Sequence, residues 1–130
     1  MRLFSVYVAA SSRERARAAA CMRRLRDAGF VVTYDWTADM PDGHNELALS
    51  LTEQRAIAEA CIKGVEQADA LWLLTGEPSR GAWVELGYSL ALPGMWRVSS
   101  GPRVTAFQAV IDHFERDDDA LAYLLELRGA

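Results

Sequence analysis

Short apolar segments rich in β-forming residues alternate with helical segments along the chain, and this alternation most constrains the fold. Strands that alternate with helices of roughly 10 to 15 residues build a mostly parallel sheet that carries helices on both faces. The sequence therefore predicts a single α/β domain over residues 1–130, in three layers, with about five mostly parallel strands. The predicted strands are 3–9, 30–35, 71–75, 96–99 and 110–114.

Apolar residues recur three and four residues apart between these strands, which is the spacing of one helical face. A helix is predicted from Ser12 to Gly29, where glycine commonly ends a helix. Further helices are predicted before 71–75, at 82–92 and at 117–127. The apolar face of the first helix consists of Ala18, Cys21, Met22, Leu25 and Ala28. That of the second consists of Ile57, Ala60, Cys61, Gly64, Val65 and Ala68. Residues 36–45 contain turn-forming Pro41, Asp42 and Gly43 without an apolar period, so we expect a loop there.

The composition excludes several classes of function. The chain has 130 residues, of which 51% are hydrophobic, and 14 basic against 18 acidic side chains give a formal net charge of −4. This charge argues against a nucleic-acid polymer as partner, and no apolar run approaches the roughly 20 residues of a membrane span. Because the N-terminus runs straight into a strand-like pattern, we expect a cytoplasmic protein. Cys21 and Cys61 lack the spacing of a zinc site or disulfide framework and are predicted to be reduced core residues.

Ligands of open α/β sheets bind at the carboxyl ends of the strands, so the residues after each strand are the candidates. The most informative of these stretches is Ser79-Arg80-Gly81, which precedes a helix. Backbone N–H groups at a helix N-terminus, beside a serine hydroxyl and an arginine, are the parts of an anion site. The stretch lacks the P-loop pattern and no GxGxxG occurs, so neither an NTPase nor a dinucleotide enzyme is indicated.

Glu85 lies about one turn into that helix, among Trp83, Val84 and Leu86. A carboxylate in such surroundings is either a surface residue on a narrow polar stripe or a partly desolvated reactive group. The residues alone leave both interpretations open. No spacing of His, Asp and Glu suggests a metal site, and no cofactor is expected.

Two motifs resemble those of the nucleoside 2-deoxyribosyltransferase family, which includes the 2′-deoxynucleoside 5′-phosphate N-hydrolases. One is Ser79-x-Gly81-x-x-x-Glu85-Leu86-Gly87-Tyr88, which follows the strand beginning at Ala68-Asp69-Ala70. The other is Val6-Tyr7-Val8-Ala9-Ala10-Ser11-Ser12-Arg13, which is similar to the family's first strand and its Gly-Ser-x-Arg-like turn, with Ala10 in place of the glycine. The order of elements matches over nearly the whole chain.

The resemblance implies a flavodoxin-like sheet and a nucleophilic role for Glu85. Its carboxylate would attack C1′ of a deoxyribosyl group, expel the nucleobase and form a glycosyl-enzyme that water or a second base resolves. The position six before the nucleophile is an aspartate in the transferases and a phosphate-binding serine in the hydrolases. Because Ser79 stands there, the resemblance favours a nucleoside 5′-monophosphate over a free nucleoside. It also implies Ser11, Arg13, Ser79 and Gly81 as phosphate and sugar contacts, and a homodimer or larger homo-oligomer. Arg80 is either an electrostatic aid at this site or a surface arginine.

One catalytic position departs from the family pattern. Members usually carry an aspartate eight residues before the Asp69 position, where this chain has Cys61. A thiol of ordinary pKa is a poor general acid, so the group that protonates the leaving base is left unassigned. Asp35, after the second strand, is the candidate substitute, with an exposed end-of-strand carboxylate as the alternative. His44 is either part of a lid over the substrate or a solvated loop residue.

Two other functions remain open at this point. A non-catalytic nucleotide-binding or signalling module would keep the Ser79–Gly81 stretch and need no leaving-group acid, which the Cys61 departure favours. An enzyme that cleaves the nicotinamide glycosidic bond of NAD would also use a glutamate on a related fold.

Overall fold

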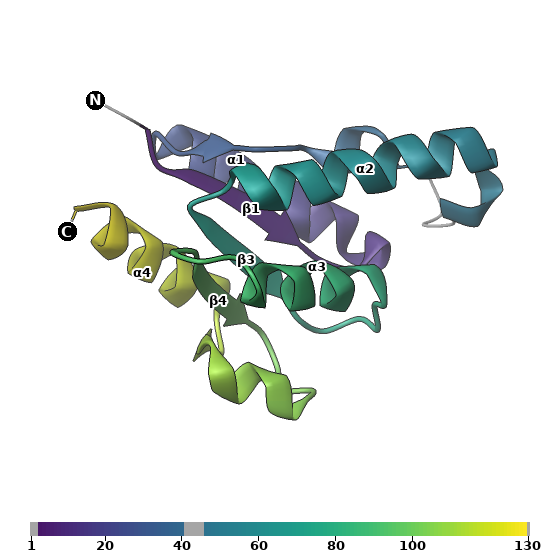
Figure 1. Cartoon of the computed structure of the whole chain (residues 1–130). Coiled ribbons are helices and arrows are strands. Elements are labelled where there is room, and N and C mark those ends of the chain that lie inside the picture. The colour runs from purple at the N-terminus through teal and green to yellow at the C-terminus, as the bar shows by residue number, and fades with distance from the viewer. Residues whose placement is uncertain (1–2, 41–45, 130) are drawn as a thin grey trace.

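Five parallel strands form one sheet in the computed structural model, which describes residues 3–40 and 46–129 (Figure 1). The strand order is β2-β1-β3-β4-β5, and every neighbouring pair is parallel. This is the order of flavodoxin-like folds, so the predicted fold class is confirmed. The strands are β1 (Ser5–Ala9), β2 (Val31–Val32), β3 (Ala70–Leu74), β4 (Trp96–Ser100) and β5 (Asp112–Phe114).

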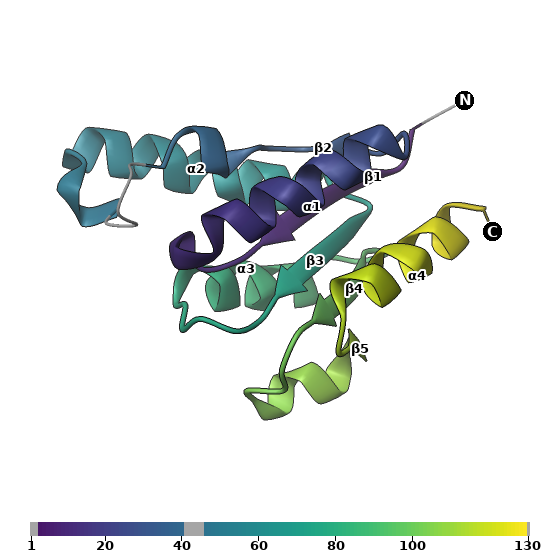
Figure 2. The ribbon, with the colours of Figure 1, turned by 180° about the vertical axis from the view of Figure 1, so that it is seen from behind.

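Helices cover both faces of the sheet, as the alternating pattern predicts. Helices α1 (Arg15–Asp27) and α4 (Asp117–Gly129) lie on one face, seen in front in Figure 2. Helices α2 (Leu51–Gln67) and α3 (Gly81–Leu90) lie on the other face (Figure 1). The start of α2 extends past the sheet on the side where β1 ends, so this helix overhangs the carboxyl edge.

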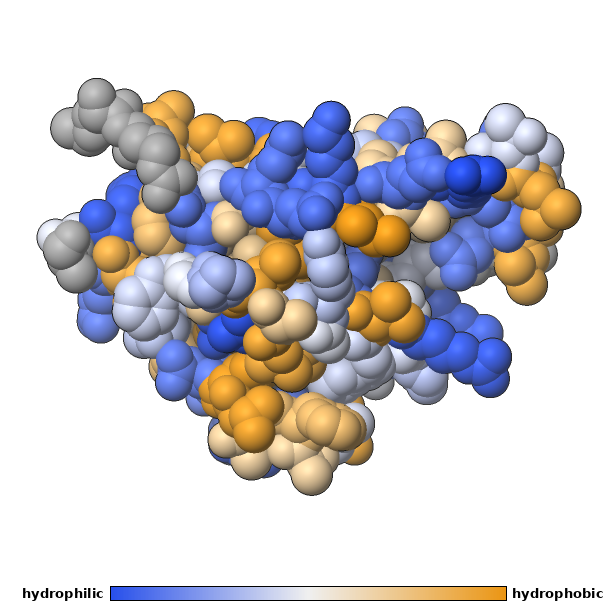
Figure 3. Space-filling model, viewed as in Figure 1, coloured by the Kyte–Doolittle hydropathy of each residue, from blue (hydrophilic) through white to orange (hydrophobic). Residues whose placement is uncertain are grey.

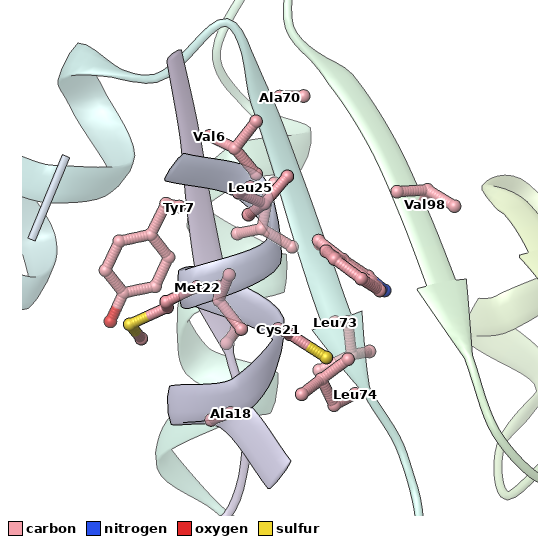
Figure 4. Close-up of a cluster of buried hydrophobic side chains, with 14 of the residues drawn as sticks. Val6, Tyr7, Ala18, Cys21, Met22, Leu25, Ala70, Leu73, Leu74 and Val98 are labelled. Carbon is pink, nitrogen blue, oxygen red and sulfur yellow. The ribbon is translucent and has the colours of Figure 1, made fainter. Parts of the chain in front are cut away.

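The core is built around β1 and β3, whose residues are all buried because each strand has a strand on either side and helices above and below. The apolar face of α1 packs on them through Ala18, Cys21, Met22 and Leu25 (Figure 4). The buried indole of Trp72 satisfies its N–H by donating to Ser100 Oγ at 2.8 Å. Cys21 and Cys61 are both free and buried, which confirms their predicted state.

The second predicted strand, 30–35, is much shorter in the structure. Only Val31 and Val32 pair with β1, because Asp35 accepts the backbone N–H of Thr37 at 3.0 Å and starts a 3-10 turn at Trp36–Ala38. The expected loop 36–45 therefore begins with ordered structure, and its remainder, 41–45, lies outside the described residues. Other 3-10 turns are Ser12–Glu14, Glu46–Ala48 and Ala106–Val110; the last shortens the predicted strand 110–114 to Asp112–Phe114.

Exposed apolar side chains gather over the α2 and α3 side of the molecule (Figure 3). They include Leu47, Leu51, Ile62 and Val84, of which Leu51 is 82% exposed. In the part of the chain that the structure describes, no helix is both long and apolar enough to cross a membrane.

Candidate active site

A cleft of about 700 Å³ opens at the carboxyl ends of β1 and β3, between the start of α2 and the start of α3. Its position agrees with the rule for open α/β sheets. Six of the seven residues predicted for the site line this cleft: Ser11, Arg13, Ser79, Arg80, Gly81 and Glu85. The seventh, Asp35, does not.

Glu85 lies in the second turn of α3, and its half-buried side chain reaches the floor of the cleft. Its Oε2 accepts a hydrogen bond of 2.6 Å from the hydroxyl of Tyr7 in β1. The Tyr7 ring has room to reach α3 because Gly64 of α2 has no side chain: a Cβ there would lie 2.9 Å from Tyr7 Cδ1. Three elements thus fix the carboxylate in place.

Burial, with a smaller contribution from the negative charge of Glu46, raises the pKa of Glu85 to about 7. Hydrogen bonds from Tyr7 and Cys61 act in the opposite direction because they stabilise the ionised carboxylate. Burial, and then the charge of Glu85, raise the pKa of Tyr7 above its usual range, so its hydroxyl remains a donor. A carboxyl group that titrates near neutral pH at the floor of a cleft is typical of a reactive group.

One end of the cleft is suited to an anion. Ser79 Oγ accepts the N–H of Ala82 at 3.1 Å, and Gly81 begins α3 with open space around its Cα. Across from it, Ser11 Oγ accepts the N–H of Arg13 at 3.1 Å. The guanidinium groups of Arg13 and Arg80 have no hydrogen-bond or ion-pair partner within residues 3–40 and 46–129. Two cationic groups and a helix N-terminus therefore line the same cleft, and together they favour a negatively charged ligand group.

The other end is mostly apolar, with Met40, Leu49 and Ile57 in its walls. Trp36 also lines it, and its indole N–H donates to Val8 O at 2.8 Å, so the ring is a fixed wall. The amide of Gln54 donates to Leu49 O at 2.9 Å. A flat, partly apolar ligand group such as a base suits this end.

The carboxylate of Asp35 is bound by neighbouring residues and does not line the cleft. Its carboxylate accepts bonds from Thr37 and forms an ion pair of 3.2 Å with Arg26. Burial raises its pKa, but the hydrogen bonds from Thr37 and Arg26 outweigh this and lower it below the usual value. The structure thus keeps the candidate substitute acid ionised and away from the cleft. His44, the possible lid residue, lies outside the described residues.

Comparison with known proteins gives a family over most of the chain. The family model described as nucleoside 2-deoxyribosyltransferase matches residues 6–121. The chain belongs to the nucleoside 2-deoxyribosyltransferase family. This range includes both motifs and the whole lining of the cleft.

Among solved structures, the fold is similar to that of a 2-deoxyribosyltransferase from Bacillus psychrosaccharolyticus. The two chains share 19% sequence identity with a TM-score of 0.66, and the match covers 89% of each chain. A comparison with curated proteins gives no match.

Cys61 differs most from the family pattern. It lies on α2, lines the cleft and is 9% exposed. Burial and then the charge of Glu85 raise the pKa of this thiol to about 12. In a family whose members usually carry an aspartate here, this chain has a neutral thiol that gives up its proton reluctantly.

Sequence reasoning missed two residues of the cleft, Tyr7 and Glu46. Tyr7 lies in an apolar strand, where a tyrosine looks like any core aromatic; only the fold shows that its hydroxyl reaches Glu85. Glu46 begins a 3-10 turn in a stretch without apolar periodicity, so no pattern placed it near the site. Within residues 3–40 and 46–129 no group of three His, Cys, Asp or Glu side chains has the geometry to hold a metal ion.

Proposed function

We propose that the protein cleaves the N-glycosidic bond of a nucleoside 5′-monophosphate or nucleoside, as an N-glycosidase or a deoxyribosyltransferase, through a covalent intermediate on Glu85. The observation that carries the proposal is the Glu85 carboxylate, held by Tyr7 at the floor of a cleft whose one end suits an anion and whose other end suits a base.

The proposed reaction has two steps at C1′ of the sugar. A Glu85 carboxylate oxygen forms a bond to C1′ while the C1′–N bond breaks, and the electron pair of that bond leaves with the base. Water or a second base then attacks C1′ from the side the first base left, which releases Glu85 and retains the configuration. Tyr7 donates to Oε2, so we assign the attack on C1′ to the other carboxylate oxygen, Oε1.

The proposed substrate places its 5′-phosphate at the start of α3. Ser11, Arg13, Ser79, Arg80 and Gly81 surround that end of the cleft and supply hydroxyl, guanidinium and backbone N–H groups. The serine at position 79 supports a nucleotide over a free nucleoside, by the resemblance to the hydrolase branch.

We also propose that the protein acts as a homodimer or larger homo-oligomer in the cytoplasm. The exposed apolar side chains Leu47, Leu51, Ile62 and Val84 support association, because they gather on one side next to the cleft (Figure 3). The two free thiols support a reducing compartment.

A nucleotide-binding module is the second candidate, and Cys61 favours it. The neutral thiol at this position leaves the anion-binding end of the cleft intact while removing the family's usual acid. Such a module would be stabilised thermally by nucleotides without releasing a base.

The decisive experiment measures free-base release by chromatography. The panel holds deoxynucleoside and ribonucleoside monophosphates, free deoxynucleosides and NAD, each with and without an acceptor base. We expect release from a deoxynucleoside monophosphate, and Glu85→Gln should lower it on the order of 10³-fold or more while nucleotide binding persists. Glu126→Gln, an exposed change on α4, is the matched control. Release only from NAD would identify a different glycosidase, and thermal stabilisation without any release would establish the binding module.

A further inference from the structure

We propose that Glu46 is the acid that protonates the departing base, and the base that activates the incoming water or acceptor. This inference rests on the proposed function and deepens it, because it assigns the one catalytic role that the family motif leaves vacant in this chain.

The first argument is the inventory of acids that face the cleft. In the described part of the chain, Glu85 and Glu46 are the carboxyl groups that line it. Glu85 is the nucleophile in the proposed reaction, so it cannot also donate the proton. Asp35 lies outside the cleft and is paired with Arg26.

The second argument excludes the other protic groups at the cleft floor. The Tyr7 hydroxyl already donates to Glu85, and burial raises the pKa of both the Tyr7 hydroxyl and the Cys61 thiol, which also lines the cleft. Donors this weak are unsuited to protonating a base during bond cleavage.

The third argument is position. Glu46 starts the 3-10 turn Glu46–Ala48 and lines the cleft together with Leu49 and Gln54. The negative charge of Glu46 raises the pKa of both Glu85 and Cys61, and the carboxyl groups of Glu46 and Glu85 line the same cleft. Glu46 is exposed and lines the cleft, so its carboxyl group is in contact with water as well as with the cleft. A pair of carboxyl groups with one as nucleophile and the other as acid and base is the arrangement of retaining glycosidases.

The proposed step balances as follows. As Glu85 bonds to C1′, the electron pair of the C1′–N bond passes to the base nitrogen, and the protonated Glu46 transfers its proton to the base. In the second step the ionised Glu46 takes a proton from the attacking water, whose oxygen bonds to C1′ while the ester to Glu85 breaks. The products are the free base, the sugar phosphate and both carboxyl groups in their starting states.

The test compares leaving groups that do and do not need a proton. Unmodified 2′-deoxyguanosine 5′-phosphate needs one, whereas its 7-methyl derivative already carries a positive charge on the base and departs as a neutral molecule. The quantity measured is kcat/KM, which reports the first, glycosylation step. We expect Glu46→Gln to lower it about 100-fold or more for the unmodified nucleotide and less than about threefold for the 7-methyl nucleotide. A burst of 7-methylguanine should precede slow turnover, because the variant also lacks the base for the second step.

Three outcomes would overturn the assignment. Equal losses for both nucleotides would show a binding or folding role for Glu46, and no loss for either would show that Glu46 takes no part. If the wild-type protein and the Glu126→Gln control release no base from these two nucleotides or from any substrate of the panel above, with or without an acceptor base, the proposed function itself fails and the role of Glu46 with it. Release that depends on Glu85 but not on Glu46 leaves the proposed function standing and removes only this inference.

Discussion

The Tyr7 hydroxyl donates to Glu85 Oε2 at 2.6 Å, and this bond joins the strand β1 to the helix α3 at the floor of the cleft. Tyr7 is fully buried and Glu85 is half-buried, so the hydroxyl depends on the carboxylate as its hydrogen-bond partner. An unpaired buried polar group costs about 1–3 kcal/mol, which makes the pair a structural as well as a chemical unit.

Tyr7→Phe should shift the pH dependence of catalysis to higher pH. The hydroxyl lowers the pKa of Glu85, so its removal raises that pKa and leaves less ionised nucleophile at neutral pH. We expect kcat/KM to fall about tenfold at pH 7 and to recover in part at pH 9. The measurement is the pH profile of base release for the wild-type protein and the variant. Identical profiles would show that Tyr7 does not affect the ionisation of Glu85.

Glu85→Gln should stabilise the fold at alkaline pH while it abolishes turnover. The folded-state pKa of Glu85, about 7, lies above its ordinary value of 4.5, so the stability linked to this group is complete below pH 4.5 and is lost as the pH rises through about 7. Glutamine carries no charge that burial penalises. Urea denaturation at pH 8.5 should give the variant an advantage on the order of 1–3 kcal/mol, which shrinks or disappears at pH 4.5. An advantage that does not vary with pH would contradict the raised pKa.

Gly64→Ala should disturb the site through Tyr7. The added Cβ would lie 2.9 Å from Tyr7 Cδ1 and 3.1 Å from Tyr34 Cβ, so the ring or α2 must move. We expect a loss of about 1–3 kcal/mol in the free energy of unfolding, with lower activity. Gly87→Ala is the matched control: this exposed position of α3 has nothing near the new Cβ, and alanine should stabilise the helix by roughly 0.5–1 kcal/mol. The two glycine-to-alanine changes should therefore alter the free energy of unfolding in opposite directions, and a loss of similar size in both would contradict the role given to Gly64.

Arg13→Ala and Arg80→Ala should discriminate between phosphorylated and free substrates. Both side chains line the anion-binding end of the cleft and are exposed, so neither change should affect folding. Each variant should raise KM for a nucleoside monophosphate about tenfold and leave KM for the free nucleoside unchanged, since a charge-assisted hydrogen bond contributes about 1.5–3 kcal/mol. Equal effects on both substrates would place the phosphate elsewhere.

Arg17→Met should destabilise the protein without a direct effect on the cleft. Arg17 forms a two-point ion pair with Asp117, at 2.8 and 2.7 Å, and donates to Thr75 O and Ser100 O, which ties α1 and α4 to the ends of β3 and β4. We expect a loss of about 1–3 kcal/mol at pH 7, measured by urea denaturation. Burial raises the pKa of Asp117, but the bonds from Arg17 and Ser100 outweigh it and lower that pKa below its usual value. The stabilisation is therefore present above about pH 4 and is lost at lower pH, where wild type and variant should converge.

The fold was predictable because its signals are local and repeated. The alternation of strands and helices, with Gly29 closing the first helix, determines a parallel sheet, and the structure places these elements as predicted. The strand at 30–35 was overestimated because Asp35 and Thr37 form a capping contact that the apolar pattern does not reveal.

The site was predictable only where residues follow a strand or fit a motif. Ser11, Ser79 and Glu85 satisfy one or both conditions and meet in one cleft. Gly64 and Glu46 satisfy neither condition, and Tyr7 lies within the first motif without a role that the motif assigns. The importance of these residues comes from side chains that meet across several elements. Asp35 follows a strand but does not line the cleft, because its carboxylate binds Arg26 and Thr37 instead.

The cap at the start of α3 bears on how such a protein can change over evolution. Ser79 accepts the N–H of Ala82 through its side-chain oxygen, and an aspartate fills that capping role equally well. The transferases and hydrolases of the family, which carry aspartate and serine at this position, can therefore exchange one residue for the other without weakening the helix. The charge offered to the substrate's 5′ end can then change while the hydrogen bond that begins α3 is kept, so specificity and stability are separable at this position.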